Sequence, residues 1–570
     1  MLSKNLNSLK RSFNTLADGL KYASISARHN SGWTDEKIVK SPLETLEIPN
    51  CTLYDYVWQN LEKWPQRTLS VCTETGRGYT YEQVFSLSNA FGANLRKKFN
   101  IRDGHTVAVM LPNIPDYPIV TMGVLEAGGV VTTINPVYTK HEVSRQLLMS
   151  NSKVIVTLPE LTTVVKDALK LNKIDIPIIV VKTNGQATPE GTVVFNELSE
   201  DVHVDKSCLK EVRRTMNDLC FLPYSSGTTG LPKGVELTNR NLVANCIQIN
   251  DKVIRTHNDT TPTHQDVVLA VLPFFHIYAA SVIMFHKMSC GVKIATMSKF
   301  QPDIFLNALV KSKANTLFAA PPLIIMMASH QAATEKTYQY LQTIINGAAP
   351  LADTDAVRLL KKAGRKLDFR QGYGLTETSP VVSMTPAGID DYSGVGVPLP
   401  NTDVKIVDAE MNNLGSNQLG ELLVRGPQVM QGYRNNPQAN SEVFVDGWFR
   451  TGDLATIADN GIITIKDRLK ELIKVKGFQV PPAELEAVIR EHPSVSDVAV
   501  IGVPHPTNGE APKAFVVLKP GETTDAQSIT DYVKDKVAPY KVIQDVMFLE
   551  TIPKNASGKI MRKTLKEQYS

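Results

Sequence analysis

The sequence predicts a multi-domain α/β protein: a large N-terminal domain of α/β sheets plus a distorted β-barrel, and a small α+β domain at the C-terminus. Its 570 residues exceed what one hydrophobic core usually supports. Short apolar segments alternate with helical ones in the first part of the chain, and a glycine-rich region of short strands follows later. The 42% hydrophobic and 21% charged residues are typical of a globular enzyme.

The alternation begins at residue 106. Strands are expected at 106–111, 129–133, 153–157 and 177–181, with a helix at 116–126. This order predicts a parallel sheet with crossover helices. Segments 318–322 and 343–347 look like strand ends that run into loops, where open α/β sheets bind ligands.

Residues 395–465 predict short antiparallel strands in a barrel-like arrangement, because glycines divide the region at frequent intervals. Past Lys470 the pattern becomes compact again. Helices are expected at 483–491 and 526–536, and strands at 497–501, 513–517 and 545–549. These segments predict the small α+β domain.

The N-terminus differs from the rest. Apolar residues from Leu2 to Leu20 recur at helical spacing, among serines and five basic residues opposed by Asp18 alone. This pattern is typical of a mitochondrial transit peptide over residues 1–32, and predicts the mitochondrial matrix. The alternatives are a surface helix in a cytoplasmic protein or an anchor at a membrane surface. The chain lacks a terminal Ser-Lys-Leu, which argues against a peroxisomal address.

Composition excludes several classes of protein. The net charge of +4 equals the basic excess of the leader, so the remainder is neutral and no nucleic-acid partner is indicated. The most apolar stretches, 117–135 and 317–329, are interrupted by Glu126 and by two prolines, which favours buried elements over membrane spans. Six cysteines without a Cys-x-x-Cys pair or a nearby histidine pattern indicate neither a zinc site nor a disulfide framework.

The most informative motif is residues 224–234, Tyr-Ser-Ser-Gly-Thr-Thr-Gly-Leu-Pro-Lys-Gly. Glycines let phosphate oxygens approach the backbone, hydroxyls donate to them, and Lys233 adds a positive charge. The spacing is not that of the common Gly-x-x-x-x-Gly-Lys-Ser/Thr loop. Taken alone, the segment indicates phosphate binding, with a polar surface turn as the alternative.

Further motifs follow in a fixed order. They are Leu-Pro-Phe-Phe-His-Ile-Tyr (272–278), Asn-Gly-Ala-Ala-Pro-Leu (346–351), Gln-Gly-Tyr-Gly-Leu-Thr-Glu (371–377), Trp-Phe-Arg-Thr-Gly-Asp (448–453), Asp-Arg-Leu-Lys-Glu-Leu-Ile-Lys-Val-Lys-Gly (467–477) and Pro-Lys-Asn-Ala-Ser-Gly-Lys (553–559). Together with the loop, this set resembles the adenylate-forming family that contains acyl-CoA synthetases, 4-coumarate:CoA ligases and beetle luciferases. The resemblance extends from about Trp33 to the C-terminus.

The resemblance implies an acid–thiol ligase that uses ATP, coenzyme A and Mg²⁺, forms an acyl-adenylate, and releases AMP and pyrophosphate. Such transition states need cations and backbone donors rather than a protein nucleophile. By resemblance, the β- and γ-phosphates are held by Ser225, Ser226, Gly227, Thr228, Thr229, Gly230 and Lys233. Glu377 would ligate Mg²⁺, Thr376 would contact the α-phosphate, and His276 would lie at the substrate carboxylate.

The AMP contacts implied by the resemblance come from several motifs. Gly347, Ala348 and Ala349 would line the adenine slot, Tyr373 would stack on the base, and Asp453 with Arg468 would bind the ribose. Gln371, Gly372, Gly374 and Met384 would complete the AMP site.

The resemblance also implies a hinge at Lys470, which divides a large domain (33–469) from a small mobile domain (470–570). Lys559 would reach the carboxylate and α-phosphate during adenylation. After rotation, Lys474 and Gln479 would face AMP, and Lys476 and Gly477 would approach coenzyme A.

The sequence says less about which carboxylic acid is the substrate. Coumarate ligases usually carry a lysine two residues before the position of Gly347, and this chain has Ile345. Apolar Ile345 and Val282, beside Tyr278, favour a medium- to long-chain fatty acid. The alternatives are a 4-coumarate-type aromatic acid, a luciferase-type oxygenase, an adenylating module that feeds a carrier protein and, from another class, a non-catalytic binding protein.

Overall fold

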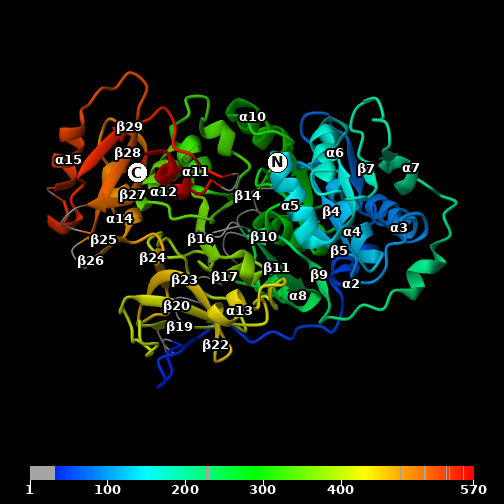
Figure 1. Ribbon diagram of the computed structural model, residues 1–570, viewed down its shortest axis with the longest axis horizontal. Helices are drawn as coiled ribbons and strands as arrows, with labels where there is room; N and C mark the ends of the chain where they lie inside the picture. Colours follow the sequence, from blue (N-terminus) through cyan, green and yellow to red (C-terminus); the bar gives the residue numbers. More distant parts are fainter. Residues whose placement is uncertain are drawn as a thin grey trace.

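The computed structural model describes residues 32–225, 232–475, 478–505, 509–534, 536–537, 539–555 and 558–569. Nearly all of the predicted leader lies outside these residues, so the transit peptide stays a prediction. Figure 1 shows the described chain with the first α/β sheet at one end, the C-terminal sheet at the other, and an antiparallel sheet below the middle. Among the described helices, none is long and apolar enough to cross a membrane.

The first sheet has the order β10-β11-β9-β5-β4-β6-β7-β8, and β21 pairs with β11. Its strands are β4 (Thr106–Val109), β5 (Val130–Thr133), β6 (Ser152–Thr157), β7 (Ile178–Val180), β8 (Val193–Val194), β9 (Leu219–Phe221), β10 (Tyr224–Ser225), β11 (Lys233–Thr238) and β21 (Gly432–Tyr433). The helices in this part are α2 (Leu53–Trp58), α3 (Tyr81–Lys98), α4 (Tyr117–Glu126), α5 (Lys140–Ser150), α6 (Thr162–Leu171), α7 (Phe195–Ser199) and α8 (Asn239–Gln248). Strands β4 to β7 pair in parallel, which confirms the alternation expected from the sequence.

Local capping explains where several of these helices begin. Thr80, Thr139 and Thr238 each accept a hydrogen bond from the backbone three residues on, at the starts of α3, α5 and α8. Each threonine thereby satisfies a backbone N–H that the first helical turn leaves without a partner.

The second sheet has the order β18-β17-β16-β15-β14-β12-β13-β2-β3. Its strands are β2 (Thr68–Cys72), β3 (Gly78–Thr80), β12 (Val267–Ala270), β13 (Lys293–Thr296), β14 (Thr316–Ala319), β15 (Thr343–Asn346), β16 (Asp368–Gly374), β17 (Val381–Met384) and β18 (Val397–Pro398). Helices η4 (Tyr278–Phe285), α9 (His286–Ser289), α10 (Pro302–Ser312), α11 (Pro321–Ser329) and α12 (Asp353–Ala363) lie between these strands in the chain. Strands β14, β15 and β16 are parallel, so the segments that follow them open at one edge of the sheet.

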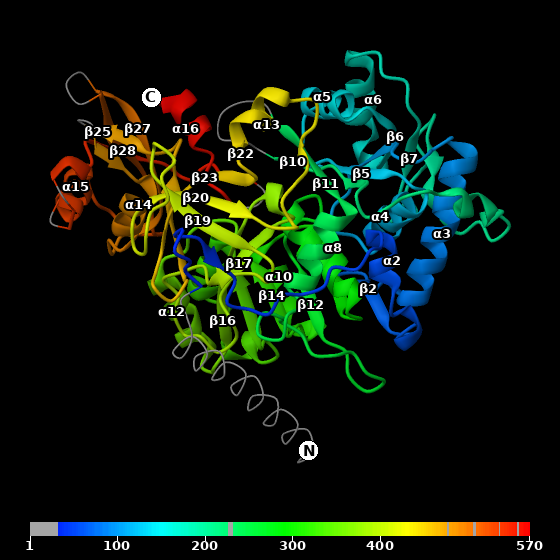
Figure 2. The ribbon, with the colours of Figure 1, turned by 90° about the horizontal axis from the view of Figure 1, so that it is seen from below.

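The glycine-rich region forms the expected antiparallel half-barrel. Its order is β1-β19-β20-β23-β22, with β24 paired to β23. The bounds are β1 (Val39–Lys40), β19 (Asp403–Val407), β20 (Gly420–Arg425), β22 (Phe444–Val445), β23 (Trp448–Ile457), β24 (Ile463–Arg468) and, outside the sheet, α13 (Pro437–Val443). Figure 2 shows this half-barrel lying between the first sheet and the C-terminal part.

The C-terminal part has its own sheet and its own apolar core. The order is β26-β25-β28-β27, with β29 paired to β28. The elements are β25 (Ile473–Val475), β26 (Phe478–Val480), α14 (Pro482–Arg490), β27 (Val495–His505), β28 (Gly509–Leu518), α15 (Ala526–Lys534), β29 (Asp545–Phe548) and α16 (Arg562–Tyr569). Strands β27 and β28 extend several residues past the sequence prediction, because they pair along almost their whole length as one hairpin. Together these sheets confirm the predicted fold class, a large N-terminal and a small C-terminal domain.

Candidate active site

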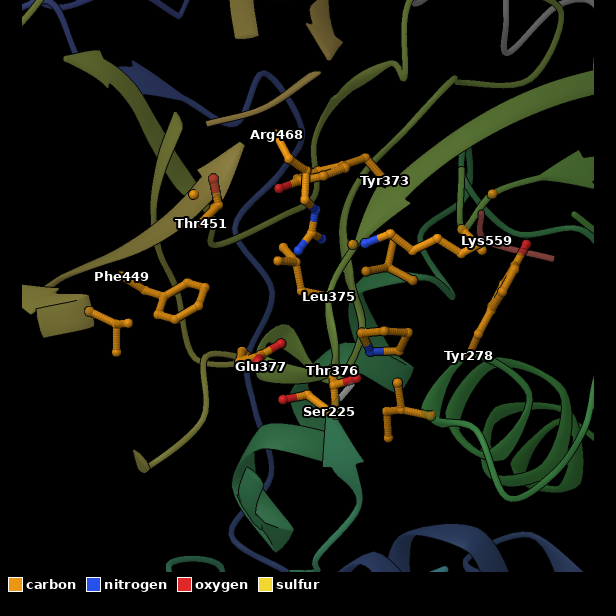
Figure 3. Close-up of a pocket in the computed structure, with 18 of the residues that line it drawn as sticks. Ser225, Tyr278, Tyr373, Leu375, Thr376, Glu377, Phe449, Thr451, Arg468 and Lys559 are labelled. Carbon is orange, nitrogen blue, oxygen red and sulfur yellow. The ribbon is translucent and has the colours of Figure 1, made fainter. Parts of the chain in front are cut away.

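A cavity of about 480 Å³ lies where the second sheet, the half-barrel and a C-terminal turn meet (Figure 3). Its size is in the range of small-molecule binding sites. Many of the residues singled out in the sequence line it. They are Ser225, Lys233, His276, Tyr278, Ile345, Gly347, Ala348, Gly372, Tyr373, Gly374, Thr376, Glu377, Met384, Arg468, Lys470 and Lys559.

The residues assigned to phosphate and metal gather at one end of the cavity. Figure 3 shows Ser225, Thr376 and Glu377 close together there. Ser225 is the register partner of Lys233 in the β10–β11 ladder, which brings the lysine to the same end. The remaining predicted loop residues, 226–230, lie outside the described residues.

Glu377 is fixed by contacts from β21 and the loop before it. Its Oε1 accepts a hydrogen bond of 2.9 Å from the Tyr433 hydroxyl, and its backbone carbonyl accepts one of 2.8 Å from Met430. The Tyr433 ring also lies under Lys233, 4.8 Å from Nζ to the ring centre. Sequence reasoning missed Tyr433. The feature that could have pointed to it was a Gly-Tyr pair in a strand to which no function was assigned.

Oxygen donors at this end suit a magnesium ion. Glu377 offers a carboxylate and Thr376 a hydroxyl, and Mg²⁺ prefers such hard ligands, usually shared with substrate phosphates. When bound, the ion would neutralise charge on the phosphates.

At the other side of the cavity, Asp453 is held by two partners. Its carboxylate accepts a hydrogen bond of 2.5 Å from the Tyr373 hydroxyl and pairs with Arg468, Nε to Oδ1 at 2.9 Å. Asp453 and Arg468 are register partners on β23 and β24, so the half-barrel itself places this pair. Arg468 and Tyr373 line the cavity, whereas Asp453 lies just behind them.

The segment after β15 brings its backbone close to Tyr278. A Cβ at Gly347 would lie 3.2 Å from the Tyr278 hydroxyl oxygen, so a side chain there would press on the ring. Ala348 has a φ of 74°, which is uncommon for a residue with a Cβ. Such conformations concentrate at functional sites, and this one gives the cavity a wall of small residues.

His276 is a neutral imidazole in this setting. Burial lowers its pKa to about 4, and its Nδ1 accepts a hydrogen bond of 3.2 Å from the Tyr278 backbone. With Nδ1 occupied as an acceptor, the proton resides on Nε2. The ring can therefore donate one hydrogen bond without carrying charge.

Lys559 enters the cavity from the C-terminal domain. Its backbone N–H donates to Asn555 Oδ1 and its carbonyl accepts from the Asn555 N–H, both at 2.9 Å, which closes a tight turn. Gly558 in this turn has a φ of 81°, and a Cβ at this position would lie 3.0 Å from the Pro322 ring of the large domain. Burial and then the charge of Arg468 lower the pKa of Lys559 to about 8.

Several predicted residues do not reach the cavity. Lys474 is exposed on β25, where its backbone donates to Glu510. Gln371 bonds to Asn346, and Ala349 and Val282 are not among the described residues that line the cavity. Lys476, Gly477 and the Gln479 side chain lie outside what the structure describes.

The expectation that Val282 faces the substrate acid stays a prediction. In η4, a π-helix, Val282 packs into the hydrophobic core.

Comparison with known proteins decides the family. The family model of AMP-binding enzymes matches residues 57–434, and that of the AMP-binding enzyme C-terminal domain matches residues 484–559. The chain belongs to the AMP-binding enzyme family. It is 36% identical over 561 residues to 4-coumarate–CoA ligase 1 of Arabidopsis thaliana, covering 96% of this chain and 98% of the relative.

Solved structures share the fold over most of the chain. ATP-bound MatB from Rhodopseudomonas palustris superposes with a TM-score of 0.81 at 26% identity, covering 91% of this chain and 99% of MatB. The o-succinylbenzoate CoA synthetase MenE from Bacillus subtilis, in complex with its acyl-adenylate intermediate, superposes with a TM-score of 0.76 at 25% identity. The match covers 91% of this chain and 98% of MenE. This AMP-binding enzyme is thus an AMP-forming acid–thiol ligase that uses ATP, coenzyme A and Mg²⁺, as the motifs predicted.

Proposed function

We propose that this ligase joins an aromatic carboxylic acid of the 4-coumarate type to coenzyme A. The observation that carries the proposal is the similarity to a 4-coumarate–CoA ligase along almost the entire chain. The cavity supports it, because the Tyr278 ring forms part of the wall and packs edge-on against Phe318, with ring centres 6.2 Å apart. An aryl group could stack or pack edge-on against such a ring.

The reaction would run in two displacements. A carboxylate oxygen of the acid attacks the α-phosphorus of ATP, and the bond to the pyrophosphate leaving group breaks. The coenzyme A thiol then loses its proton, attacks the acyl carbon of the adenylate, and AMP leaves. Lys559 and Lys233 are placed to oppose the charge that builds on the phosphates in the first step.

One observation favours a second candidate, the medium- to long-chain fatty acid expected from the sequence. Ile345 lines the cavity and is only 1% exposed, so this part of the wall offers no hydrogen bond to a phenolic hydroxyl. An alkyl chain would gain about 0.8 kcal/mol for each CH₂ buried there.

A substrate panel separates the two. We expect kcat/KM for 4-coumarate or cinnamate to exceed that for every saturated acid from C8 to C16, measured by pyrophosphate release and by thioester formation. A preference for the alkyl acids would overturn the aromatic assignment and leave the ligase chemistry intact. The Ile345→Lys variant sharpens the comparison: it should raise the ratio of 4-coumarate to cinnamate activity, because only 4-coumarate carries a hydroxyl to receive the amine's hydrogen bond.

A further inference from the structure

A cluster of side chains with metal-ligand chemistry lies outside the catalytic cavity. His257, His286 and Cys290 each offer one ligand atom, and these atoms all lie within 4.8 Å of one another. His257 and His286 are 8% and 1% exposed, and their rings cross at 72° with centres 5.3 Å apart. Cys290 is half-buried, which leaves the cluster a route to solvent.

A fourth potential ligand completes the group. Asn250 Oδ1 lies 3.5 Å from His286 Nε2 and 3.7 Å from Cys290 Sγ. The contact to His286 is long for an N–H···O hydrogen bond, and a thiol is a weak donor. Both distances instead match the edges of a tetrahedral zinc site, which come to about 3.4–3.7 Å for bonds of about 2.0–2.3 Å.

The local structure explains how these four residues come together although the chain has no Cys-x-x-Cys motif. His286 and Cys290 are four residues apart, at the start and the C-cap of α9, and therefore lie on one face. Asn250 follows α8, and His257 lies before β12. A metal ion would link the segments that carry Asn250 and His257 to α9. Helix α9 directly follows η4, the helix that begins with Tyr278 of the cavity wall.

We propose that Asn250, His257, His286 and Cys290 form a binding site for one Zn²⁺ ion per chain. One thiolate and two imidazoles are ligands that zinc prefers, and the Asn250 amide oxygen would be a weaker fourth ligand. Binding would release the thiol proton of Cys290 to solvent and contract the cluster toward tetrahedral geometry.

One side chain works against the ion. Lys287 Nζ lies 3.0 Å from His257 Nδ1 and 2.8 Å from Thr256 Oγ1, in a fully buried position. An ammonium group there repels a cation. We therefore expect that replacing Lys287 by an apolar side chain strengthens metal binding.

The test uses the full-length protein, reduced and freed of metal. Zn²⁺ is titrated against a chromogenic chelator, and Co²⁺ is added separately as a spectroscopic probe. We expect one equivalent of either ion, with thiolate-to-cobalt absorption in the near ultraviolet and a rise in Tm on adding Zn²⁺. Cys290→Ser should abolish the thiolate band and weaken zinc binding by on the order of 100-fold, whereas the matched control Cys208→Ser, a half-buried thiol elsewhere, should change neither.

Lys287→Met keeps the proposal falsifiable should Cys290→Ser fail to fold. This variant should bind Zn²⁺ at least about tenfold more tightly than the parent, since a like charge beside the ligands is removed. Absence of stoichiometric zinc in the parent, equal binding by Cys290→Ser and the parent, or unchanged affinity in Lys287→Met would each overturn the site. Tight copper binding without zinc binding would also overturn the assignment to Zn²⁺.

Discussion

Two lysines of the C-terminal domain occupy opposite situations. Lys559 lies in a turn that enters the cavity, with Gly558 packed against Pro322. Lys474 stands exposed on β25, 85 positions earlier in the chain, and does not line that cavity. In this arrangement Lys559 reaches the cavity, beside the hinge residue Lys470, whereas Lys474 does not. If Lys559 acts in adenylate formation, as we propose, this arrangement fits that step, and a role for Lys474 at the same site would require the domain to move.

The largest effect is expected at Lys559. Lys559→Ala should slow adenylate formation by about 100-fold or more, as for the loss of a preorganised charge stabiliser. Acid-dependent exchange of pyrophosphate into ATP measures this step. The matched control is Lys563→Ala, a nearby exposed lysine paired with Glu567, which should retain parental exchange. Equal losses in both variants would show that the effect is not specific to the cavity.

A smaller effect is expected at Lys474, and in the other half-reaction. Lys474→Ala should slow thioester formation by roughly tenfold, because in the rotated arrangement that we propose it would lose one charge opposite AMP, and it should leave pyrophosphate exchange unchanged. Stopped reactions with coenzyme A and preformed adenylate measure the step. A loss of exchange of the same size would mean that the exposed position of Lys474 does not describe the adenylating state.

A third prediction tests the hinge at Lys470. Lys470→Pro restricts φ at the point about which the domain would turn, and should reduce thioester formation several-fold more than adenylation. Because Lys470 also lines the cavity, Lys470→Ala is needed as the control for loss of the side chain. Equal behaviour of the two variants in both half-reactions would argue against a hinge at this residue.

The last prediction is a pH dependence, whose effect is smallest near neutral pH. Burial and Arg468 lower the pKa of Lys559 to about 8, and only the protonated amine opposes phosphate charge. The favourable form is therefore complete well below pH 8 and is lost as the pH rises through it. We expect kcat/KM for ATP to fall about twofold at that pKa and about tenfold per unit beyond it. A profile flat to pH 10 would contradict this assignment.

Much of the fold was accessible from the sequence, because strand and helix patterns such as those at 106–133 are set by local periodicity. Cavity residues inside ordered motifs, such as Glu377 and Lys559, were also found. The burial of Val282 in the core could not be told from its place in a short apolar run, because buried and cavity-facing apolar residues look alike in sequence. The His257 cluster escaped because its members lie on separate segments, and the spacing of His286 and Cys290 is only a weak signal.

The most direct test of the central claim, one lysine for each half-reaction, supplies 4-coumaroyl-AMP and coenzyme A to purified Lys559→Ala and Lys474→Ala. The account predicts that Lys559→Ala, though defective in making the adenylate, converts the supplied one to thioester at close to the parental rate, while Lys474→Ala does not. If both variants consume the adenylate equally slowly, or if Lys559→Ala is the slower, the division of labour between the two lysines is wrong.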